Sequence, residues 1–163
     1  MRKFLVVFNL LACVATPASA ADPQAEVQQV VEVFRTAIIA KDGPALRALF
    51  LPGHDSWFSV DAAAEHRRRV EKNPAAPRIH PDTSARFADS IAGDKQRLEE
   101  VFTNVKVHAD DAIASVHFDY VFLSDGKATN HGQEAWQLVN TAQGWKIVSL
   151  VYSVDTGPQG VAP

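Results

Sequence analysis

The chain has 163 residues, of which 16 are Lys or Arg, 19 are Asp or Glu and 47% are hydrophobic. This length corresponds to about one domain, and the ordinary apolar content excludes a low-complexity or disordered chain. A net charge of -3 argues against nucleic-acid binding, and a single cysteine excludes a disulfide framework and a cysteine-based zinc site.

Residues 1–20 have the features of a secretory signal peptide. A short basic start precedes an apolar run over Phe4–Ala15, and small residues follow at positions 18–20. We therefore expect cleavage after Ala20, a periplasmic or secreted location, and no membrane attachment once the segment is removed. The alternative is a lipoprotein anchored at Cys13, because the residues before it resemble a lipobox.

The next part of the chain shows helical spacing of its apolar residues. From Glu26 to Lys41 these residues fall on one helix face, and Asp42-Gly43 ends the pattern. Pro44 suits the first turn of a second helix that ends near Phe50. The following predicted elements are a strand over Trp57–Val60, a helix capped by Asp61 that ends near Lys72, a proline-containing loop over Asn73–Pro81, and a helix over Ser84–Lys95.

Strands make up the rest of the predicted domain. They are expected over Glu99–His108, Ala112–Ser124, Lys127–Asn140 and Trp145–Ser153. Asp125-Gly126 is typical of a tight hairpin turn. Helices that precede an antiparallel meander indicate an α+β fold.

Two stretches of sequence resemble a known family. One is Lys41-Asp42-Gly43 leading into the helix at 45–50, and the other is Gly-Gln-Glu-Ala-Trp-Gln-Leu-Val at 132–139 followed by Gly-Trp-Lys-Ile-Val at 144–148. They are similar to the opening and closing segments of the nuclear transport factor 2-like superfamily. This superfamily includes ketosteroid isomerase, scytalone dehydratase, the SnoaL-like polyketide cyclases and many secreted proteins. The resemblance covers nearly all of Val27–Ser153, and it specifies fold more than chemistry.

The resemblance implies a cone-shaped roll. N-terminal helices would pack on a strongly curved antiparallel sheet, and a ligand cavity would open at one end. The domain would extend over residues 21–155, followed by a flexible tail over 156–163 that is rich in Gly and Pro.

The predicted turns set the strand registers. With Asp125-Gly126 as the turn, Tyr120 lies opposite His131, and the last hairpin places Ala135 opposite Leu150. Because side chains alternate between the two faces of a sheet, one face is predicted to be the inner, core side. It carries Val101, Val105, Val107, Ala114, Val116, Phe118, Tyr120, Phe122, Ala135, Val139, Val148, Leu150 and Tyr152.

The opposite face is predicted to be the outer one. His117, Asp119 and Glu134 converge there, either as an acid–base device or as a solvated band of cross-strand charge pairs. We favour the solvated band. We expect no metal at these residues, because no second histidine is placed beside them.

The outer face would also expose a large apolar cluster. Its members are Trp136, Leu138, Trp145 and Ile147. Such a surface is unusual on a monomer, and members of the superfamily commonly dimerise through this sheet. We therefore expect a homodimer that forms through this face.

Polar-tipped and aromatic side chains of the inner face are candidates for a binding site. A few polar groups that converge on an apolar concave surface are typical of small-molecule sites. The candidate ligand-binding residues are Trp57, Thr103, Phe118, Tyr120, His131, Gln133, Gln137 and Tyr152. The alternative is that each tyrosine hydroxyl only bonds to the backbone.

The expected function is the binding of a small apolar or aromatic molecule, without catalysis and without a cofactor. A second hypothesis is an isomerase- or dehydratase-type enzyme in which His131 acts as a base with Tyr120 or Tyr152. A third is a structural or interaction module whose cone is filled by its own side chains. The first-strand aspartate that serves ketosteroid isomerases as a general base has no clear match, because Val60 lies near that position and Asp61 is one residue out of phase.

The run His66-Arg67-Arg68-Arg69 has two interpretations. It could bind an anion such as a phosphate group. It could also be the solvated face of a helix, balanced by Glu65 and Glu71, and this is the interpretation we favour.

Overall fold

Helix α1 (Pro23–Ala40) opens the fold in the computed structural model, which describes residues 22–158. The carboxylate of Asp22 caps α1 by accepting a hydrogen bond from the Gln24 amide, and Lys41 ends it in the left-handed backbone conformation. Helix α2 (Gly43–Ala48) follows directly, and helix α4 (Ser84–Gly93) packs beside it.

Parts of the predicted organisation lie outside the described residues. The signal peptide at 1–20, with Cys13, precedes residue 22, and most of the tail predicted over 156–163 follows residue 158. Within 22–158, no helix has the length and apolar composition that a membrane span needs.

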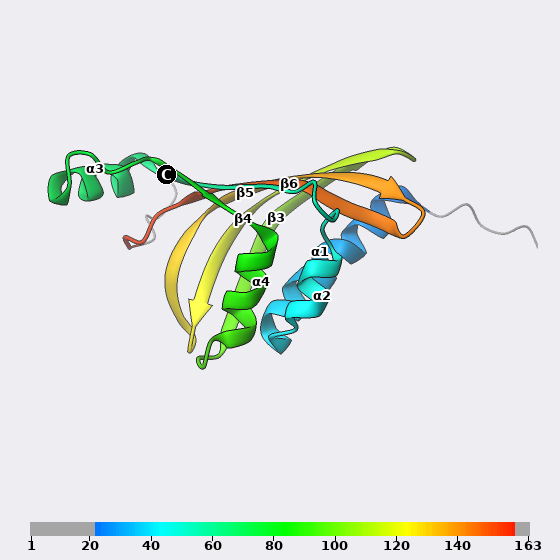
Figure 1. Cartoon of the computed structure of the whole chain (residues 1–163), viewed down its shortest axis with the longest axis horizontal. Coiled ribbons are helices and arrows are strands. Elements are labelled where there is room, and N and C mark those ends of the chain that lie inside the picture. The colour runs from blue at the N-terminus through cyan, green and yellow to red at the C-terminus, as the bar shows by residue number, and fades with distance from the viewer. Residues whose placement is uncertain (1–21, 159–163) are drawn as a thin grey trace, which may run out of the picture.

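The sheet has six strands in the order β2-β1-β6-β5-β4-β3. Their bounds are β1 (Ser56–Asp61), β2 (Ile79–Asp82), β3 (Leu98–Ala109), β4 (Ile113–Ser124), β5 (Lys127–Thr141) and β6 (Gly144–Val154). Strand β1 runs parallel to β6, and the other neighbouring strands are antiparallel. Helices α1, α2 and α4 lie on one side of the curved sheet, and helix α3 (Ala63–Lys72) lies beyond one end of it (Figure 1).

This architecture confirms the predicted α+β fold, with N-terminal helices on a curved sheet. It differs in two details. The parallel pair makes the sheet mixed, and β2 lies in the stretch Asn73–Pro81 that was expected to be a loop. Pro81 is compatible with a strand here because β2 is at the edge of the sheet, where one side of the backbone needs no partner.

The core lies between α1 and the concave face of the sheet. The ring of Phe34 on α1 is centred 4.9 Å from that of Trp136 on β5, and Phe118 on β4 meets Trp136 edge-on at 5.2 Å. Phe118 and Trp136 are completely buried. Large aromatic side chains therefore supply much of the burial that holds α1 against the sheet.

A β-bulge in the β4–β5 hairpin decides which residues of β5 face the core. Next to the turn the register is the predicted one, with Ser124 opposite Lys127, but beyond the bulge Tyr120 lies opposite Gly132 instead of His131. A bulge adds one residue to one strand, so every later side chain on that strand moves to the other face. The predicted faces of β5 are therefore wrong.

The four apolar residues that were expected to form a dimer surface belong to the core. The β4–β5 bulge turns Trp136 and Leu138 inward, and a second register shift, which leaves Val148 of β6 without an opposite residue, does the same for Trp145 and Ile147. The pairing of β5 with β6 shows the same exchange, since Trp136 and not Ala135 lies opposite Leu150. The exposed fractions of the four side chains are small, at 0% for Trp136, 1% for Leu138, 6% for Trp145 and 0% for Ile147. Homodimer formation stays a prediction, but these residues do not form its surface.

Candidate functional site

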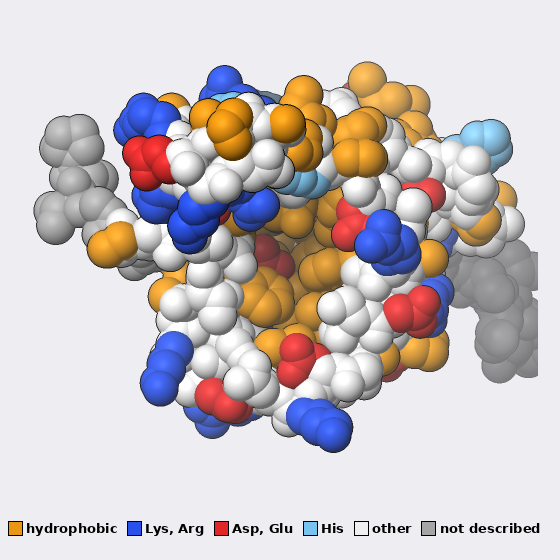
Figure 2. Space-filling view, turned by 60° about the vertical axis from the view of Figure 1, so that its left-hand side comes forward, with side chains coloured by type: hydrophobic (Ala, Val, Ile, Leu, Met, Phe, Trp, Pro, Cys, Tyr) orange, Lys and Arg blue, Asp and Glu red, His pale blue; other side chains and the backbone are white. Residues whose placement is uncertain are grey.

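A cavity of about 170 Å³ lies between the helices and the concave face of the sheet. Figure 2 looks onto the side of the molecule where α3 lies in Figure 1, and it shows a hollow with a largely hydrophobic floor. The residues that line the cavity are Phe34, Trp57, Phe87, Glu100, Tyr120, Phe122, Asn130, Glu134 and Tyr152.

Aromatic rings from different elements form most of the wall. Trp57 on β1 lies 4.9 Å from Phe87 on α4, measured between ring centroids, and meets Tyr152 on β6 edge-on at 6.5 Å. Tyr120 on β4 meets Tyr152 edge-on at 5.9 Å. A cavity of ~150 Å³ lined by apolar side chains can hold benzene, so this one has room for one substituted aromatic ring.

Two carboxyl groups lie in this aromatic cavity. Glu100 on β3 is 4% exposed and Glu134 on β5 is 5% exposed. Glu134 and Trp136 are two residues apart on β5 and so lie on the same face of the sheet. The Trp136 indole donates a hydrogen bond of 2.5 Å to the Glu134 Oε1 atom. The bulge thus turns this acidic residue inward together with its tryptophan neighbour.

Burial determines the protonation of both carboxyls. Loss of water raises the pKa of Glu134 to about 8, although the hydrogen bond from Trp136 opposes this change. Burial also raises the pKa of Glu100 well above its usual value, and the nearby Glu134 raises it further. Glu134 therefore carries a proton at neutral pH, and burial favours the neutral form of Glu100 as well. A neutral carboxylic acid can donate a hydrogen bond as well as accept one.

Tyrosine and asparagine side chains complete the polar part of the wall. The Tyr120 hydroxyl lies 3.0 Å from the Asn130 side-chain oxygen and 3.0 Å from the Ser153 carbonyl oxygen, and it can donate to either. Burial raises the pKa of Tyr120, and the neighbouring Glu134 and Glu100 add to this effect. Burial also raises the pKa of Tyr152. Both phenols consequently remain neutral at physiological pH.

One donor in the wall has no acceptor. Among the described residues, the Nε1 atom of Trp57 is buried and lacks a hydrogen-bond partner. A buried donor without a partner costs free energy, and a ligand that brings an acceptor would recover it.

The structure brings together three of the predicted ligand-binding residues, which are Trp57, Tyr120 and Tyr152. Phe118 is buried in the core beside the cavity. The remaining four do not line it, and they are Thr103, His131, Gln133 and Gln137.

The β-bulge explains why the predicted pair of His131 and Tyr120 is wrong. Tyr120 points to the inner face, where its register partner is Gly132, and His131 therefore points to the other face. Gln133 lies on that same outer face, where its side chain donates to Asp119 at 3.0 Å. An acid–base pair of His131 with Tyr120 is thus not assembled.

The two carboxyls of the cavity were not among the binding residues predicted from the sequence. A usable signal was present on β5, because Glu134 is in phase with Trp136 and Leu138. A strand that places one acidic residue on the same face as two large apolar residues either exposes the apolar side chains or buries the acid. The structure shows the second outcome.

The convergence of His117, Asp119 and Glu134 is also wrong, since Glu134 is on the inner face. Asp119 stays outside, where hydrogen bonds from Asn104 at 2.6 Å and from Gln133 at 3.0 Å lower its pKa. Within residues 22–158, no group of three or more His, Asp, Glu or Cys side chains is arranged to hold a metal ion.

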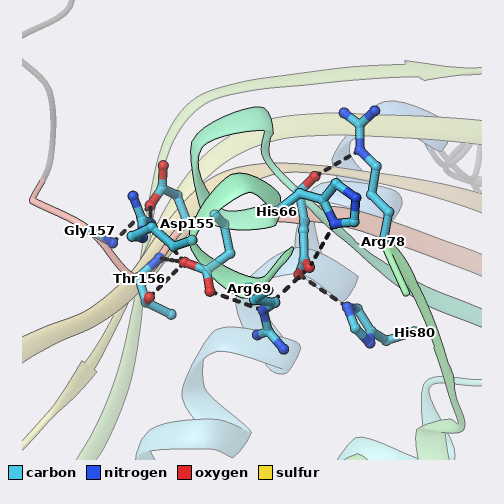
Figure 3. A network of polar contacts seen from close by, with 10 residues as sticks. His66, Arg69, Arg78, His80, Asp155, Thr156 and Gly157 are labelled. Carbon is cyan, nitrogen blue, oxygen red and sulfur yellow. Dashed lines mark hydrogen bonds and ion pairs between the residues drawn. The ribbon is translucent and has the colours of Figure 1, made fainter. Parts of the chain in front are cut away.

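Asp61 forms a second buried acidic site at the end of β1. It was expected to cap a helix and to be out of phase with the inner face, but its side chain is completely buried on the same face as Trp57. Its Oδ1 atom lies 3.1 Å from His80 Nε2, and its Oδ2 atom lies 3.3 Å from Arg69 Nε (Figure 3). His66 Nδ1 is 3.8 Å from Oδ2 and makes no hydrogen bond to it.

The basic run on α3 is therefore neither a free anion site nor a simple solvated face. Arg69 pairs with Asp61 and Glu65, and Arg68 pairs with Glu65 and Asp155. Both arginines therefore form ion pairs with carboxylates of the same chain.

Comparison with known proteins identifies the fold. No protein-family model and no curated protein matches the sequence. Among solved structures, a protein with a cystatin-like fold from Novosphingobium aromaticivorans superimposes with a TM-score of 0.59 at 13% identity, covering 84% of this chain and 84% of that one. A protein from Shewanella baltica gives 0.57 at 12% identity, with 82% and 94% covered.

A third similar structure is a provisionally named dehydratase from Streptomyces avermitilis, with a TM-score of 0.58 at 18% identity, covering 82% of this chain and 96% of that one. All three are described as nuclear transport factor 2-like. At these identities the likeness concerns the fold alone. The chain has the nuclear transport factor 2-like fold, as the resemblance in its sequence predicted.

Proposed function

We propose that this protein of nuclear transport factor 2-like fold binds a small, neutral, aromatic molecule that carries a hydrogen-bond acceptor such as a carbonyl group. The observation that carries the proposal is the pair of buried carboxyls, Glu100 and Glu134, inside a cavity walled by aromatic rings. We further propose, from the residues at 1–20, that the protein acts outside the cytoplasm.

The chemistry of the wall selects for such a ligand. Three phenylalanines, one tryptophan and two tyrosines favour a flat, apolar molecule, which makes ring contacts and leaves water on binding. The protonated Glu134 carboxyl and the unpaired Trp57 Nε1–H are donors, so they favour an acceptor on the ligand. An anionic ligand would lose its hydration in an apolar cavity without gaining a cationic partner there.

Three molecules of similar size test the proposal by isothermal titration calorimetry at about pH 6, where Glu134 is protonated. Acetophenone has a ring and a carbonyl group, ethylbenzene has no acceptor, and benzoate is charged. We expect acetophenone to bind about tenfold more tightly than ethylbenzene, since one hydrogen bond is worth ~1 kcal/mol or more. Benzoate should bind most weakly.

Two matched variants locate the binding site. Phe122→Trp enlarges a side chain that lines the cavity, and Val151→Trp adds the same ring on the exposed outer face of β6. The first should weaken acetophenone binding and the second should not. Equal affinity for all three molecules, or equal effects of the two variants, would contradict the proposal.

A second candidate function is acid–base catalysis on the bound molecule. The observation that favours it is the pKa of about 8 for Glu134, because proton transfer is most efficient when the pKa of the group lies near the working pH. Glu100 would be the second proton carrier, in place of the His131 expected from the sequence. One structural neighbour is provisionally named a dehydratase, which agrees with this candidate. The open cavity argues against the third alternative, a cone filled by its own side chains.

A further inference from the structure

The side chain of Trp136 is held firmly in the core beside the cavity. It is completely buried, its ring lies 4.9 Å from that of Phe34, and it meets Phe118 edge-on at 5.2 Å. Its Nε1 atom donates the 2.5 Å hydrogen bond to Oε1 of Glu134. Because close packing keeps the indole ring in place, this hydrogen bond also keeps the carboxyl group of Glu134 in place.

The other oxygen of this carboxyl group is open to the cavity. Within residues 22–158, the side chain of Glu134 makes its one hydrogen bond through Oε1, so Oε2 has no partner. The buried side-chain nitrogen and oxygen atoms that lack a partner in this part of the chain are Trp57 Nε1, Asp61 Oδ2 and His66 Nδ1. Oε2 of Glu134 is not one of these buried atoms, so it reaches the cavity that Glu134 lines.

The indole also decides which oxygen carries the proton. Glu134 is protonated at neutral pH, because burial raises its pKa to about 8. An indole N–H can only donate, so the oxygen that it meets acts as the acceptor and the proton is left to the other oxygen. The O–H group of Glu134 is therefore at Oε2, on the side of the cavity.

We propose that Trp136 is a positioning residue, which binds Oε1 of Glu134 and thereby directs the carboxyl O–H at Oε2 into the cavity, so that the site selects ligands that carry a hydrogen-bond acceptor. This inference rests on the proposed function and names the residue that determines its specificity. Trp136 does not line the cavity, so it acts through Glu134 and not by contact with the ligand.

The hydrogen bond matters because a carboxyl group that nothing holds can turn either oxygen toward a ligand. The carboxyl group of Glu100 is of this kind, since no side chain of the described residues donates a hydrogen bond to it. At Glu134 the donor is oriented in advance, so the ligand does not have to order it on binding. The preference for an acceptor should therefore reside at Glu134, and Trp136 maintains it.

Trp136→Phe tests the positioning, because it removes the indole N–H and keeps an aromatic ring in the core. The quantity to measure is the ratio of the affinities for acetophenone and ethylbenzene, by calorimetry at about pH 6. A change in the size of the cavity affects both molecules alike, so it leaves this ratio unchanged. We expect the ratio to fall from about tenfold in the wild type to about threefold, because part of the gain from the oriented hydrogen bond is lost.

Trp145→Phe is the matched control. The indole of Trp145 is also buried and also donates to a carboxylate, at 2.9 Å from Oε2 of Glu26, but neither residue lines the cavity. This variant should keep the ratio of the wild type. An unchanged ratio in Trp136→Phe, or an equal fall in Trp145→Phe, would overturn the proposal.

The pH dependence of unfolding tests the same hydrogen bond without a ligand. Burial raises the pKa of Glu134 and the hydrogen bond from Trp136 lowers it, so loss of this bond should raise the pKa further. The free energy of unfolding falls with rising pH until Glu134 ionises in the folded chain, and in Trp136→Phe this fall should end about one pH unit higher.

The two variants leave the other titratable groups that face Glu134 in place. These are Glu100 on β3, Tyr120 on β4 and Tyr152 on β6. Trp145→Phe should therefore follow the pH dependence of the wild type. If Trp136→Phe loses the same stability at every pH, Trp136 contributes packing alone and the proposal is wrong.

The indole N–H resonance of Trp136 in the wild type decides the matter if Trp136→Phe does not fold. A carboxylate accepts a stronger hydrogen bond than a neutral carboxyl group, so this proton should move downfield as the pH rises through about 8, and Glu134→Gln should abolish the movement. A resonance that stays constant from about pH 6 to about pH 9.5 would contradict the positioning. If acetophenone does not bind to the wild type, the proposed function fails, and the role of Trp136 is judged by unfolding and by this resonance.

Discussion

Replacing Glu134 with glutamine should remove a large part of the pH dependence of stability above about pH 5. Glutamine has nearly the same shape, and its side-chain oxygen can still accept the hydrogen bond from Trp136. The substitution therefore removes the ionisation of residue 134 with little change in packing. The other titratable groups that face it are Glu100, Tyr120 and Tyr152.

The size of the effect follows from the pKa of Glu134. Burial raises this pKa to about 8 from an ordinary value of 4.5. The folded chain thus keeps a proton that the unfolded chain releases, so the stabilisation is complete below 4.5 and is lost as the pH rises through about 8. Each pH unit in this window costs ~1.4 kcal/mol, which gives a loss of about 5 kcal/mol.

Urea unfolding, followed by tryptophan fluorescence from about pH 5 to about pH 8.5, measures this loss. The free energy of unfolding of the wild type should fall across the window, and the Glu134→Gln variant should fall by several kcal/mol less. Glu71→Gln, which removes an exposed carboxyl on α3, is the control and should follow the wild type. Curves for wild type and Glu134→Gln that stay parallel within about 1 kcal/mol would show that Glu134 ionises normally, and the reasoning would be refuted.

Three further outcomes are expected. Gly132→Ala should destabilise the fold by about 3 kcal/mol in urea unfolding, because a Cβ there would lie 2.0 Å from the Ser153 carbonyl oxygen. The control is Gly93→Ala, since a Cβ at Gly93 would have no atom within 4 Å. Equal stabilities of the two variants would contradict the close approach at Gly132. Trp136→Glu should abolish the folded circular dichroism spectrum, and a folded monomer in sedimentation would instead support the predicted dimer surface. Because hydrogen bonds from Thr156, Arg68 and Arg69 lower the pKa of Glu65 to about 2, its support of α3 should be lost as the pH falls through that value, and hydrogen exchange in α3 that is independent of acid would contradict this.

The sequence predicts the order and kind of most elements because the relevant signals are local. Helical spacing identifies α1, and Asp125-Gly126 identifies the β4–β5 turn, where both residues have the positive φ angles that a tight hairpin needs. The α+β class and the cone-like fold follow from this order. The short strand β2 was missed because four residues with one proline have no pattern of their own.

The faces of β5 and β6 could not be predicted because each depends on a register shift that has no turn signal. One shift leaves Thr129 of β5 without an opposite residue on β4, and the other leaves Val148 of β6 without an opposite residue on β5. Each change inserts one residue, and one residue is enough to exchange the inner and outer faces. The prediction therefore placed Trp136 outside and His131 inside, the reverse of the structure.

The part of the site that was found lies on strands without such an inserted residue. Tyr120 lies on β4 and Trp57 on β1, and these strands follow simple alternation near the cavity. Glu134 was assigned to the wrong face together with its neighbours on β5. The sequence does contain a signal for this residue, because Glu134 is in phase with Trp136. With Trp136 placed in the core, the same spacing predicts an acidic side chain on the inner face.

The affinity for acetophenone as a function of pH tests most directly whether the buried carboxyls bind a neutral acceptor. For the wild type, the dissociation constant measured by calorimetry should be constant below about pH 7 and should rise about tenfold as Glu134 loses its proton near pH 8. For Glu134→Gln, which keeps a neutral donor at all pH values, the rise should be much smaller. A wild-type affinity that does not change between about pH 6 and about pH 9, or that changes equally in the variant, would contradict the role of these carboxyls.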